Sequence, residues 1–158
     1  MTRKPAWYEE VTTPALLRHA RTTYGSAMRR ALADAGYDDI PRNGLYLIGG
    51  MAFHEGDMPL GNLVRDLRVS KQAAGQLVDT LVTRGYLQRD VDEQDRRKLT
   101  VMLTDRGREA ASVQTDARKK IDADLLAHAG KGNVAITRKT LAALVEIGRR
   151  QEDDHDDA

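Results

Sequence analysis

Two groups of polar side chains in this chain have types and spacing suited to hydrogen bonding with a polyanion. The first is Lys71, Gln72 and Gln76, in a stretch whose apolar residues recur at helical spacing. Glutamine amides one helical turn apart can pair with adenine edges, and a lysine can reach guanine or phosphate. A solvated polar helix face is an equally good interpretation of this stretch when it is considered alone.

Gly75 lies on the same face of the expected helix. Glycine costs about 1 kcal/mol relative to alanine in a helix interior, so its presence there needs a reason. Close approach of a DNA backbone would explain it, and so would close packing against a neighbouring helix.

The second group lies in a charged loop, residues 92–98, that contains no apolar residue. The flanking residues, 86–91 and 99–103, alternate with the period of strands and predict a hairpin. The loop carries Asp95, Arg96, Arg97 and Lys98 at its tip. A narrow minor groove attracts arginine, and Asp95 is close enough in sequence to orient Arg97. An ordinary charged hairpin tip is the alternative, and it is less favoured after a helix-turn-helix.

The elements that must position these groups follow from apolar spacing and from capping residues. Ser70 is a suitable N-cap, Gly85 a suitable helix stop, and residues 55–57 form an expected turn. Thr104 is expected to cap a long helix that Gly130 and Gly132 interrupt. Helices are therefore expected at 14–35, 45–54, between Pro59 and Leu67, at 70–84, from 104 onward and at 134–151.

This order of elements predicts a mainly α fold: a winged helix-turn-helix with a two- to three-stranded antiparallel wing. We divide the chain into an N-terminal dimerisation segment (1–41), a DNA-binding domain (42–104) and C-terminal dimerisation helices with an acidic tail (105–158). The winged core is too small to cover the apolar faces of the long terminal helices, so a second copy is expected to cover them. Packing of these helices on one another is the alternative. The expected dimer residues are Leu16, Leu125, Leu141, Leu144 and Val145.

Composition narrows the functional classes. The 158 residues are 41% hydrophobic and 31% charged, without an apolar run long enough to span a bilayer, so we expect a cytoplasmic protein with no membrane partner. The absence of cysteine excludes disulfides and thiolate metal sites. Five acids lie within residues 151–158, and removing them changes the net charge from +1 to +6. A basic body is compatible with a polyanionic partner, but only weakly indicative of one.

Several short patterns in register resemble the winged helix of the MarR (multiple antibiotic resistance regulator) family. They are residues 63–67, 69–70, 77–81 and 84–89, followed by the charged loop at 92–98 and by residues 103–108. The resemblance implies a triangular homodimer with the winged domains at two corners. It places Ser70, Lys71, Gln72 and Gln76 against the major groove, and Arg97, supported by Asp95, in the minor groove. The chain departs from the family at Gly61, where members often have a hydroxyl residue that contacts phosphate.

The resemblance also implies a function: a sequence-specific transcription regulator, a repressor that binds double-stranded DNA at an inverted repeat. Family members often bind a small aromatic or phenolic anion between the dimer helices and the winged domain. Candidate lining residues for such a small-molecule effector are Tyr24, Met28, Tyr46, Met51 and His54. Each of these is also typical of a plain core.

Two other functional classes are alternatives to a transcription regulator. An enzyme is disfavoured, because the four histidines are far apart in sequence and no glycine-rich phosphate loop is present, and we expect no cofactor. His54 and Glu55 with Asp57 lack the His-x-x-x-His spacing that zinc sites often use, so no metal is expected. A winged helix that binds protein in place of DNA would not need basic residues such as Lys71 and Arg97 on its recognition helix and wing.

Overall fold

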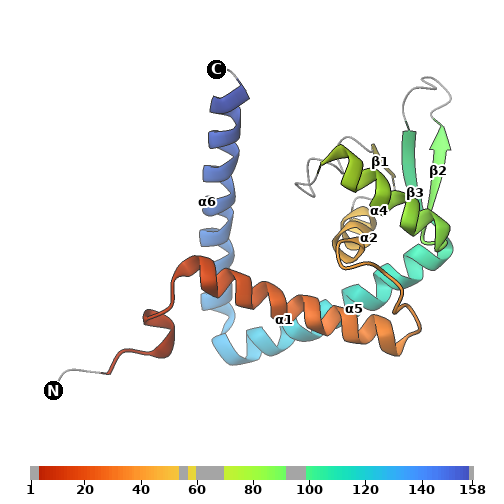
Figure 1. Ribbon diagram of the computed structural model, residues 1–158. Helices are drawn as coiled ribbons and strands as arrows, with labels where there is room; N and C mark the ends of the chain where they lie inside the picture. The colour runs from red at the N-terminus through yellow and green to blue at the C-terminus, as the bar shows by residue number, and fades with distance from the viewer. Residues whose placement is uncertain (1–3, 54–56, 60–69, 92–98, 157–158) are drawn as a thin grey trace. The chain divides into compact units, whose positions relative to one another are not determined.

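The computed structural model describes residues 4–53, 57–59, 70–91 and 99–156 (Figure 1). The chain forms two compact units, residues 1–118 and 119–158, so the division into 1–41, 42–104 and 105–158 stays a prediction. No helix in the described part of the chain is both long and apolar enough to cross a bilayer.

The chain is mainly helical, with one small sheet in the first unit. The described helices are the 3-10 turn η1 (Trp7–Glu9), α1 (Thr13–Asp34), α2 (Gly44–Phe53), α4 (Lys71–Thr83), α5 (Asp105–Ala129) and α6 (Lys131–Asp156). The strands are β1 (Asp57–Pro59), β2 (Leu87–Val91) and β3 (Leu99–Leu103). They form an antiparallel sheet in the order β1-β3-β2, with Leu87 opposite Leu103 and Val91 opposite Leu99. The predicted winged helix-turn-helix fold is confirmed.

Helix α4 begins and ends at the residues that the sequence indicated. The Ser70 hydroxyl accepts a hydrogen bond from the backbone N–H of Ala73 at 3.1 Å, which satisfies one of the open donors of the first turn. Gly85 adopts a φ of 76°, a left-handed conformation that ends the helix at low cost. The chain then turns back, and the Tyr86 N–H donates to the carbonyl of Leu81 at 2.9 Å.

Helix α5 starts directly against the base of the hairpin. The Thr104 hydroxyl accepts from the N–H of Gly107 at 3.0 Å and donates to the carbonyl of Gly85 at 2.6 Å. A Cβ at Gly107 would lie 2.1 Å from the carbonyl oxygen of Tyr86, so only glycine allows this approach. The predicted cap at Thr104 is therefore confirmed, and it also ties the helix to the turn after α4.

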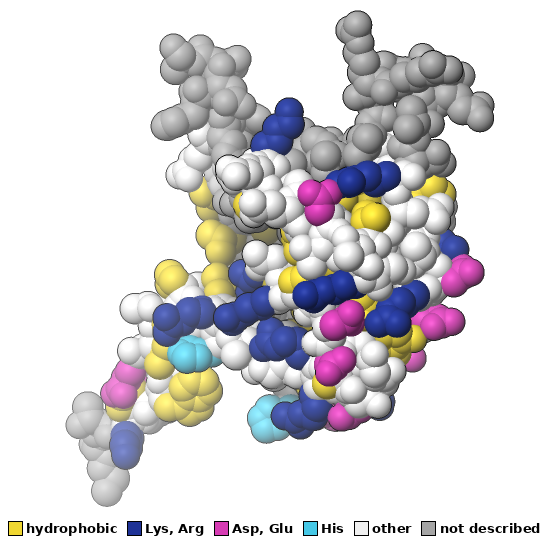
Figure 2. Space-filling model, turned by 45° about the vertical axis from the view of Figure 1, so that its right-hand side comes forward, with side chains coloured by type: hydrophobic (Ala, Val, Ile, Leu, Met, Phe, Trp, Pro, Cys, Tyr) yellow, Lys and Arg dark blue, Asp and Glu magenta, His cyan; other side chains and the backbone are white. Residues whose placement is uncertain are grey.

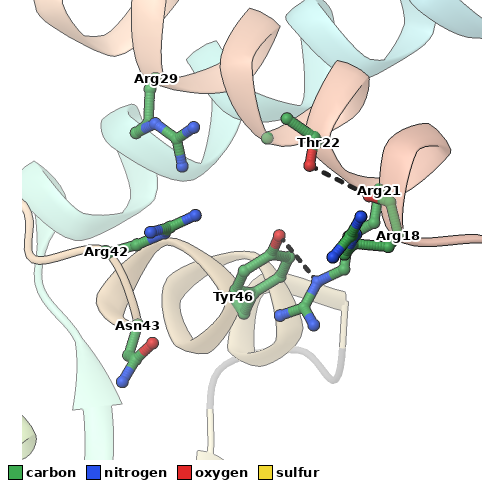
Figure 3. Close-up of a pocket in the computed structure, with 8 residues that line it drawn as sticks. Arg18, Arg21, Thr22, Arg29, Arg42, Asn43 and Tyr46 are labelled. Atoms are coloured by element: carbon green, nitrogen blue, oxygen red, sulfur yellow. Dashed lines mark hydrogen bonds between the residues drawn. The ribbon is translucent and has the colours of Figure 1, made fainter. Parts of the chain in front are cut away.

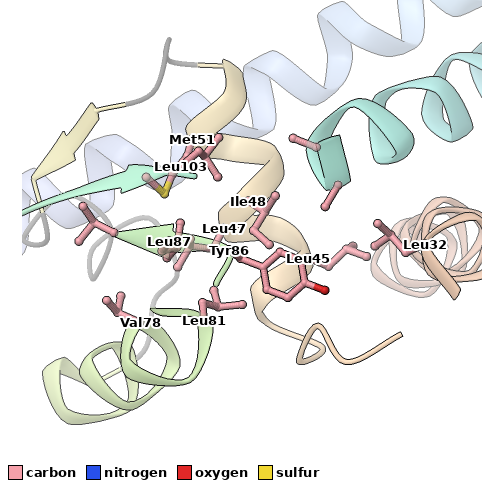
Figure 4. Close-up of a cluster of buried hydrophobic side chains, with 13 residues drawn as sticks. Leu32, Leu45, Leu47, Ile48, Met51, Val78, Leu81, Tyr86, Leu87 and Leu103 are labelled. Carbon is pink, nitrogen blue, oxygen red and sulfur yellow. The ribbon is translucent and has the colours of Figure 1, made fainter. Parts of the chain in front are cut away.

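The core of the first unit joins α1, α2, α4, the sheet and the start of α5 (Figure 4). Figures 1 and 4 both show α2 lying between α1 and α4. Ile48, Val78, Leu81, Tyr86 and Val101 are each 0% exposed. Aliphatic side chains supply most of this core, as expected from a composition with only 4% aromatic residues.

Three details differ from the sequence-based expectation or lie beyond it. Asp57, expected in a turn, begins β1, which pairs with β3 as the third strand of the wing sheet. The last helix starts at Lys131 and runs to Asp156, because Gly130 (φ 82°) alone makes the break after α5. The helix expected between Pro59 and Leu67 lies outside the described residues.

Candidate nucleic-acid interface and ligand cavities

Helix α4 buries one face and exposes the other. Ala74, Val78 and Leu81 are 0% exposed, whereas Lys71, Gln72 and Gln76 are all exposed. The three polar residues therefore share a surface that the core fixes in position. No described atom lies within 4 Å of a Cβ built at Gly75, so no described helix packs closely against it.

An ion pair between Asp79 of α4 and Arg89 of β2 connects this helix to the strand that leads into the charged loop. Both side chains are substantially exposed, so the pair adds little to stability. The pair links the exposed face of α4 to the wing strand, while the buried residues of α4 fix its position. This pair was not predicted from the sequence.

The charged loop itself, with Asp95, Arg96, Arg97 and Lys98, lies outside the described residues. The strands on either side of it are described, and they pair in register from Leu87–Leu103 to Val91–Leu99. The hairpin predicted on both sides of the loop is thus present, and the roles of the four loop residues stay predictions.

A buried tyrosine anchors the base of the wing. The Tyr86 hydroxyl donates a hydrogen bond to the Asp39 carboxylate and accepts one from the Arg106 guanidinium at 3.0 Å. Arg106 also lies 3.4 Å from the Asp39 carboxylate and stacks 4.6 Å from the centre of the Tyr86 ring. The network joins the loop before α2, the end of the α4 turn and the first turn of α5.

The same contacts shift the protonation equilibria of the network. The hydrogen bond from Tyr86, with help from the Arg106 charge, lowers the pKa of Asp39 despite some desolvation. Burial first, and then Asp39, raise the pKa of Tyr86. The Tyr37 hydroxyl donates to Glu109 at 2.9 Å, and this contact is the main reason why its pKa is raised. At neutral pH each group therefore holds the charge state that its partners need.

A cavity of about 690 Å³ lies in the first unit, and we call it the α1–α2–α5 cavity. Three of its lining residues were candidates from the sequence: Tyr24, Met28 and Tyr46. Gln114 also lines it, is 3% exposed, and has a side-chain nitrogen with no hydrogen-bond partner among the described residues. An unpaired buried amide is costly, so this donor is suited to a ligand oxygen.

Of the other two ligand candidates, Met51 does not line this cavity. Met51 is 1% exposed and belongs to the core, where it packs with Ile48 and Leu103. His54 lies outside the described residues.

A second cavity, of about 380 Å³, lies between α1 and the start of α2 (Figure 3). We call it the arginine cavity, because four of the eight described residues that line it are arginines. The eight are Arg18, Arg21, Thr22, Gly25, Arg29, Arg42, Asn43 and Tyr46. Exposed Lys and Arg side chains, dark blue in Figure 2, extend across the middle of the face shown there.

Within the described residues, no group of three or more His, Asp or Glu side chains is placed to hold a metal ion.

A model of the MarR family matches residues 38–98, which include α2, α4, β2 and the charged loop. This segment of the chain is therefore similar to the MarR family. No protein of curated function matches the chain in sequence.

Solved MarR-fold regulators resemble this chain over most of their length. The transcriptional regulator Tm0710 from Thermotoga maritima is 24% identical, with 87% of this chain and 94% of that one covered and a TM-score of 0.57. FabT from Streptococcus pneumoniae, solved in complex with DNA, is 17% identical over 89% and 99%, with a TM-score of 0.70. BpsR from Bordetella bronchiseptica, whose DNA binding is regulated by 6-hydroxynicotinic acid, is 18% identical over 90% and 98%, with a TM-score of 0.65.

The residues expected at a MarR-type dimer interface lie on α1, α5 and α6. Leu16 is half-buried, whereas Leu125, Leu141, Leu144 and Val145 are 38–54% exposed. Three further large apolar side chains of the second unit are also exposed: Leu126, Ile136 and Ile147. The structure therefore leaves these apolar surfaces without cover from the chain's described residues, and their role in a dimer stays a prediction.

Sequence reasoning missed Gln114 and the four arginines of the arginine cavity. Gln114 follows Val113 in the apolar stripe of α5, and nothing in that pattern shows that a glutamine points inward. The arginines are spread from Arg18 to Arg42, over two elements, so only the packing of α1 against α2 brings them together. A count of basic residues at helical spacing on α1 was the one available signal.

Proposed function

We propose that this protein is a transcription regulator that binds duplex DNA as a homodimer through α4 and the charged loop. The observation that carries the proposal is the exposed face of α4, with Lys71, Gln72 and Gln76 opposite a fully buried stripe. In a helix-turn-helix the second helix lies in the major groove. On that helix, amide side chains pair with adenine and lysine pairs with guanine or phosphate.

Two neighbours of these side chains support the same contact. Ser70 caps α4 with its hydroxyl oxygen, and the hydroxyl hydrogen can be donated to a phosphate at the helix N-terminus. Gly75 has no side chain, so it leaves space on the exposed face between the two glutamines. The helix backbone can therefore approach the groove. The single-residue assignments of Ser70, Lys71, Gln72, Gly75 and Gln76 are part of this proposal.

The charged loop completes the interface in the adjacent minor groove. Arg97 enters the groove, Asp95 orients its guanidinium, and Arg96 and Lys98 contact phosphates. The described strands support this arrangement, because the Tyr86 network anchors their base to α5 and the Asp79–Arg89 pair links β2 to α4.

A second copy of the chain covers the exposed apolar residues of α5 and α6. Leu141, Leu144 and Val145 follow one another at helical spacing, and each is more than one-third exposed in the monomer. A two-fold dimer presents two α4 helices, which predicts an operator with inverted half-sites about one helical turn (~10 bp) apart.

The α1–α2–α5 cavity binds a small aromatic or phenolic anion that releases the protein from DNA, which makes the protein a repressor. The cavity combines apolar walls with the unpaired amide nitrogen of Gln114, which can donate to a ligand carboxylate or carbonyl. The regulation of BpsR by 6-hydroxynicotinic acid supports this class of ligand.

The test is fluorescence anisotropy with a duplex obtained by selection from random DNA. Gln72→Ala or Gln76→Ala should weaken binding by about 1–3 kcal/mol and relax the preference at one base pair. Gln151→Ala, which removes an exposed glutamine from α6, is the matched control and should change nothing. Equal affinity for the α4 variants and the wild type, or no binding to any duplex at low salt, would refute the proposal and favour a protein partner.

A further inference from the structure

The arginine cavity carries a concentration of positive charge that the proposed DNA contacts do not use. Arg18, Arg21 and Arg29 enter it from α1, and Arg42 enters from the segment just before α2 (Figure 3). Among the residues that the structure describes, no acidic side chain lines the cavity. All four arginines are exposed, so solvent screens part of their mutual repulsion, and a bound anion would offset the remainder.

The contacts within the cavity leave most of this charge uncompensated. Arg21 donates a hydrogen bond to the Tyr46 hydroxyl at 3.1 Å, and its guanidinium lies 4.5 Å from the centre of the Tyr46 ring. Arg29 reaches the hydroxyl of Ser26 at 3.5 Å. These partners are neutral. Across the described residues, Arg18 and Arg42 make no ion pair at all.

Gly25 keeps the floor of this cavity open. A Cβ built there would lie 3.4 Å from the Tyr46 hydroxyl and 3.6 Å from a guanidinium nitrogen of Arg29. A larger side chain would occupy the space between these donors. Glycine therefore allows both donors to face the same volume, which suits one ligand with several acceptor oxygens.

We propose that the arginine cavity binds a small polyanion, a phosphate ester or a polycarboxylate with at least two negative charges. Guanidinium groups bind such oxygens in pairs, and their hydrogen bonds to charged oxygens are stronger than neutral ones. A volume of about 380 Å³ suits a small metabolite. The inference goes beyond the proposed function, since it assigns a second ligand site with a different chemistry from the α1–α2–α5 cavity.

The position of the cavity favours a free polyanion over a DNA phosphate. The cavity is bounded by α1 and the start of α2, and α2 lies between α1 and the recognition helix α4. DNA held against the exposed face of α4 would therefore contact α4 and not the side of α2 that lines the cavity. Tyr46 lines both cavities, so the two cavities adjoin, while their other lining residues differ.

The test is isothermal titration of the full chain with citrate, pyrophosphate and benzoate at constant ionic strength. Saturable binding of citrate or pyrophosphate is expected, with one site per protomer and no competition from benzoate. Arg42→Gln should weaken this binding at least tenfold, because one of the two unpaired guanidinium groups is lost. Arg30→Gln, which removes an exposed arginine of α1 that does not line the cavity, is the matched control and should stay within twofold of wild type.

Three results would overturn the proposal. They are the absence of saturable binding, an equal loss in Arg30→Gln, and a loss of duplex affinity in Arg42→Gln that matches its loss of pyrophosphate affinity. The last would assign the cavity to DNA phosphates. Circular dichroism melting shows whether each variant folds, and Arg18→Gln takes the place of Arg42→Gln if the latter does not. Because DNA binding is measured separately, failure here leaves the proposed function standing.

Discussion

The two units of the chain differ in how far their large apolar side chains are buried. In residues 1–118, Ile48, Leu81 and Tyr86 are all 0% exposed and share one core. In residues 119–158, Ile136 is 66% exposed and Val145 54% exposed. The first unit therefore has a core of its own, although Trp7 and Tyr8 near its start are exposed, whereas the second unit exposes apolar side chains that the proposed dimer would bury.

This difference separates two kinds of stability. A unit with its own core unfolds with a free energy that does not depend on protein concentration. Helices that are stabilised by a second copy gain or lose stability with concentration, because association and folding are linked. Variants in the two units should therefore differ in the size of their effects on stability. They should also differ in whether those effects depend on protein concentration.

The largest effect is expected where the first unit is packed most tightly, at Gly107→Ala. The new Cβ would lie 2.1 Å from the Tyr86 carbonyl, so the hairpin base and α5 must separate. We expect a loss of about 3 kcal/mol or more in the free energy of unfolding, measured by urea denaturation. Gly132→Ala in α6 is the control, because no described atom lies within 4 Å of its Cβ. A similar cost for both variants would contradict the comparison.

The second unit should respond most strongly to a charge in its exposed apolar surface. Leu144 is 47% exposed in the monomer, and a dimer would bury it. Leu144→Glu should raise the dimer dissociation constant at least about 100-fold, since burying an unpaired charge costs several kcal/mol. Sedimentation equilibrium measures this constant. Glu146→Gln, two residues away on α6, is the control; an unchanged dimer in Leu144→Glu would mean that α6 does not form the interface.

Tyr86→Phe should have a smaller effect, again within the first unit. It keeps the ring in the core but removes hydrogen bonds to Asp39 and Arg106, both of which are charged. The expected loss is about 2 kcal/mol in the free energy of unfolding, independent of protein concentration. Tyr8→Phe is the control, because Tyr8 is 51% exposed. A loss in Tyr86→Phe that grows on dilution would place the network at the dimer interface instead.

The same network predicts a pH dependence. The folded state lowers the pKa of Asp39, so the carboxylate stabilises the fold above its unfolded pKa of 3.8, and this contribution is lost as the pH falls through the folded value. The pKa of Tyr86 is raised in the folded state, so its protonated hydroxyl stabilises the fold at lower pH. This contribution is lost as the pH rises above 10. Urea midpoints from pH 6 to pH 3 should therefore fall more steeply for wild type than for Asp39→Asn. Parallel curves would mean that Asp39 is not stabilised as a carboxylate.

Local signals in the sequence predicted the elements of the first unit well. Ser70, Gly85 and Thr104 act through their own backbone neighbourhood, so a capping or stop residue could be recognised without knowledge of the fold. The stripe Ala74, Val78 and Leu81 was recognisable for the same reason, because helical periodicity is local.

The contents of the two cavities could not be predicted in this way. Met51 has the same character as Met28, yet one lies in the core and the other lines a cavity, and only the packing of α2 against its neighbours decides which. Gln114 lines one cavity together with residues of α1 and α2, and Arg42 lines the other together with residues of α1. A long-range arrangement determines their surroundings, and side-chain type alone does not reveal it.

The smallest expected effect concerns Gly75, where one substitution should change the stability of α4 and its affinity for DNA in opposite directions. Gly75→Ala should stabilise α4 by up to about 1 kcal/mol, because alanine is the better helix former and no described atom lies within 4 Å of the new Cβ. The same methyl group would hold the helix away from the groove and so should weaken duplex binding several-fold. Gly132→Ala, another helix glycine with an open Cβ position, should leave duplex binding unchanged. Unaltered duplex affinity in Gly75→Ala would show that the backbone of α4 does not approach DNA closely, and it would leave the glutamines alone to carry recognition.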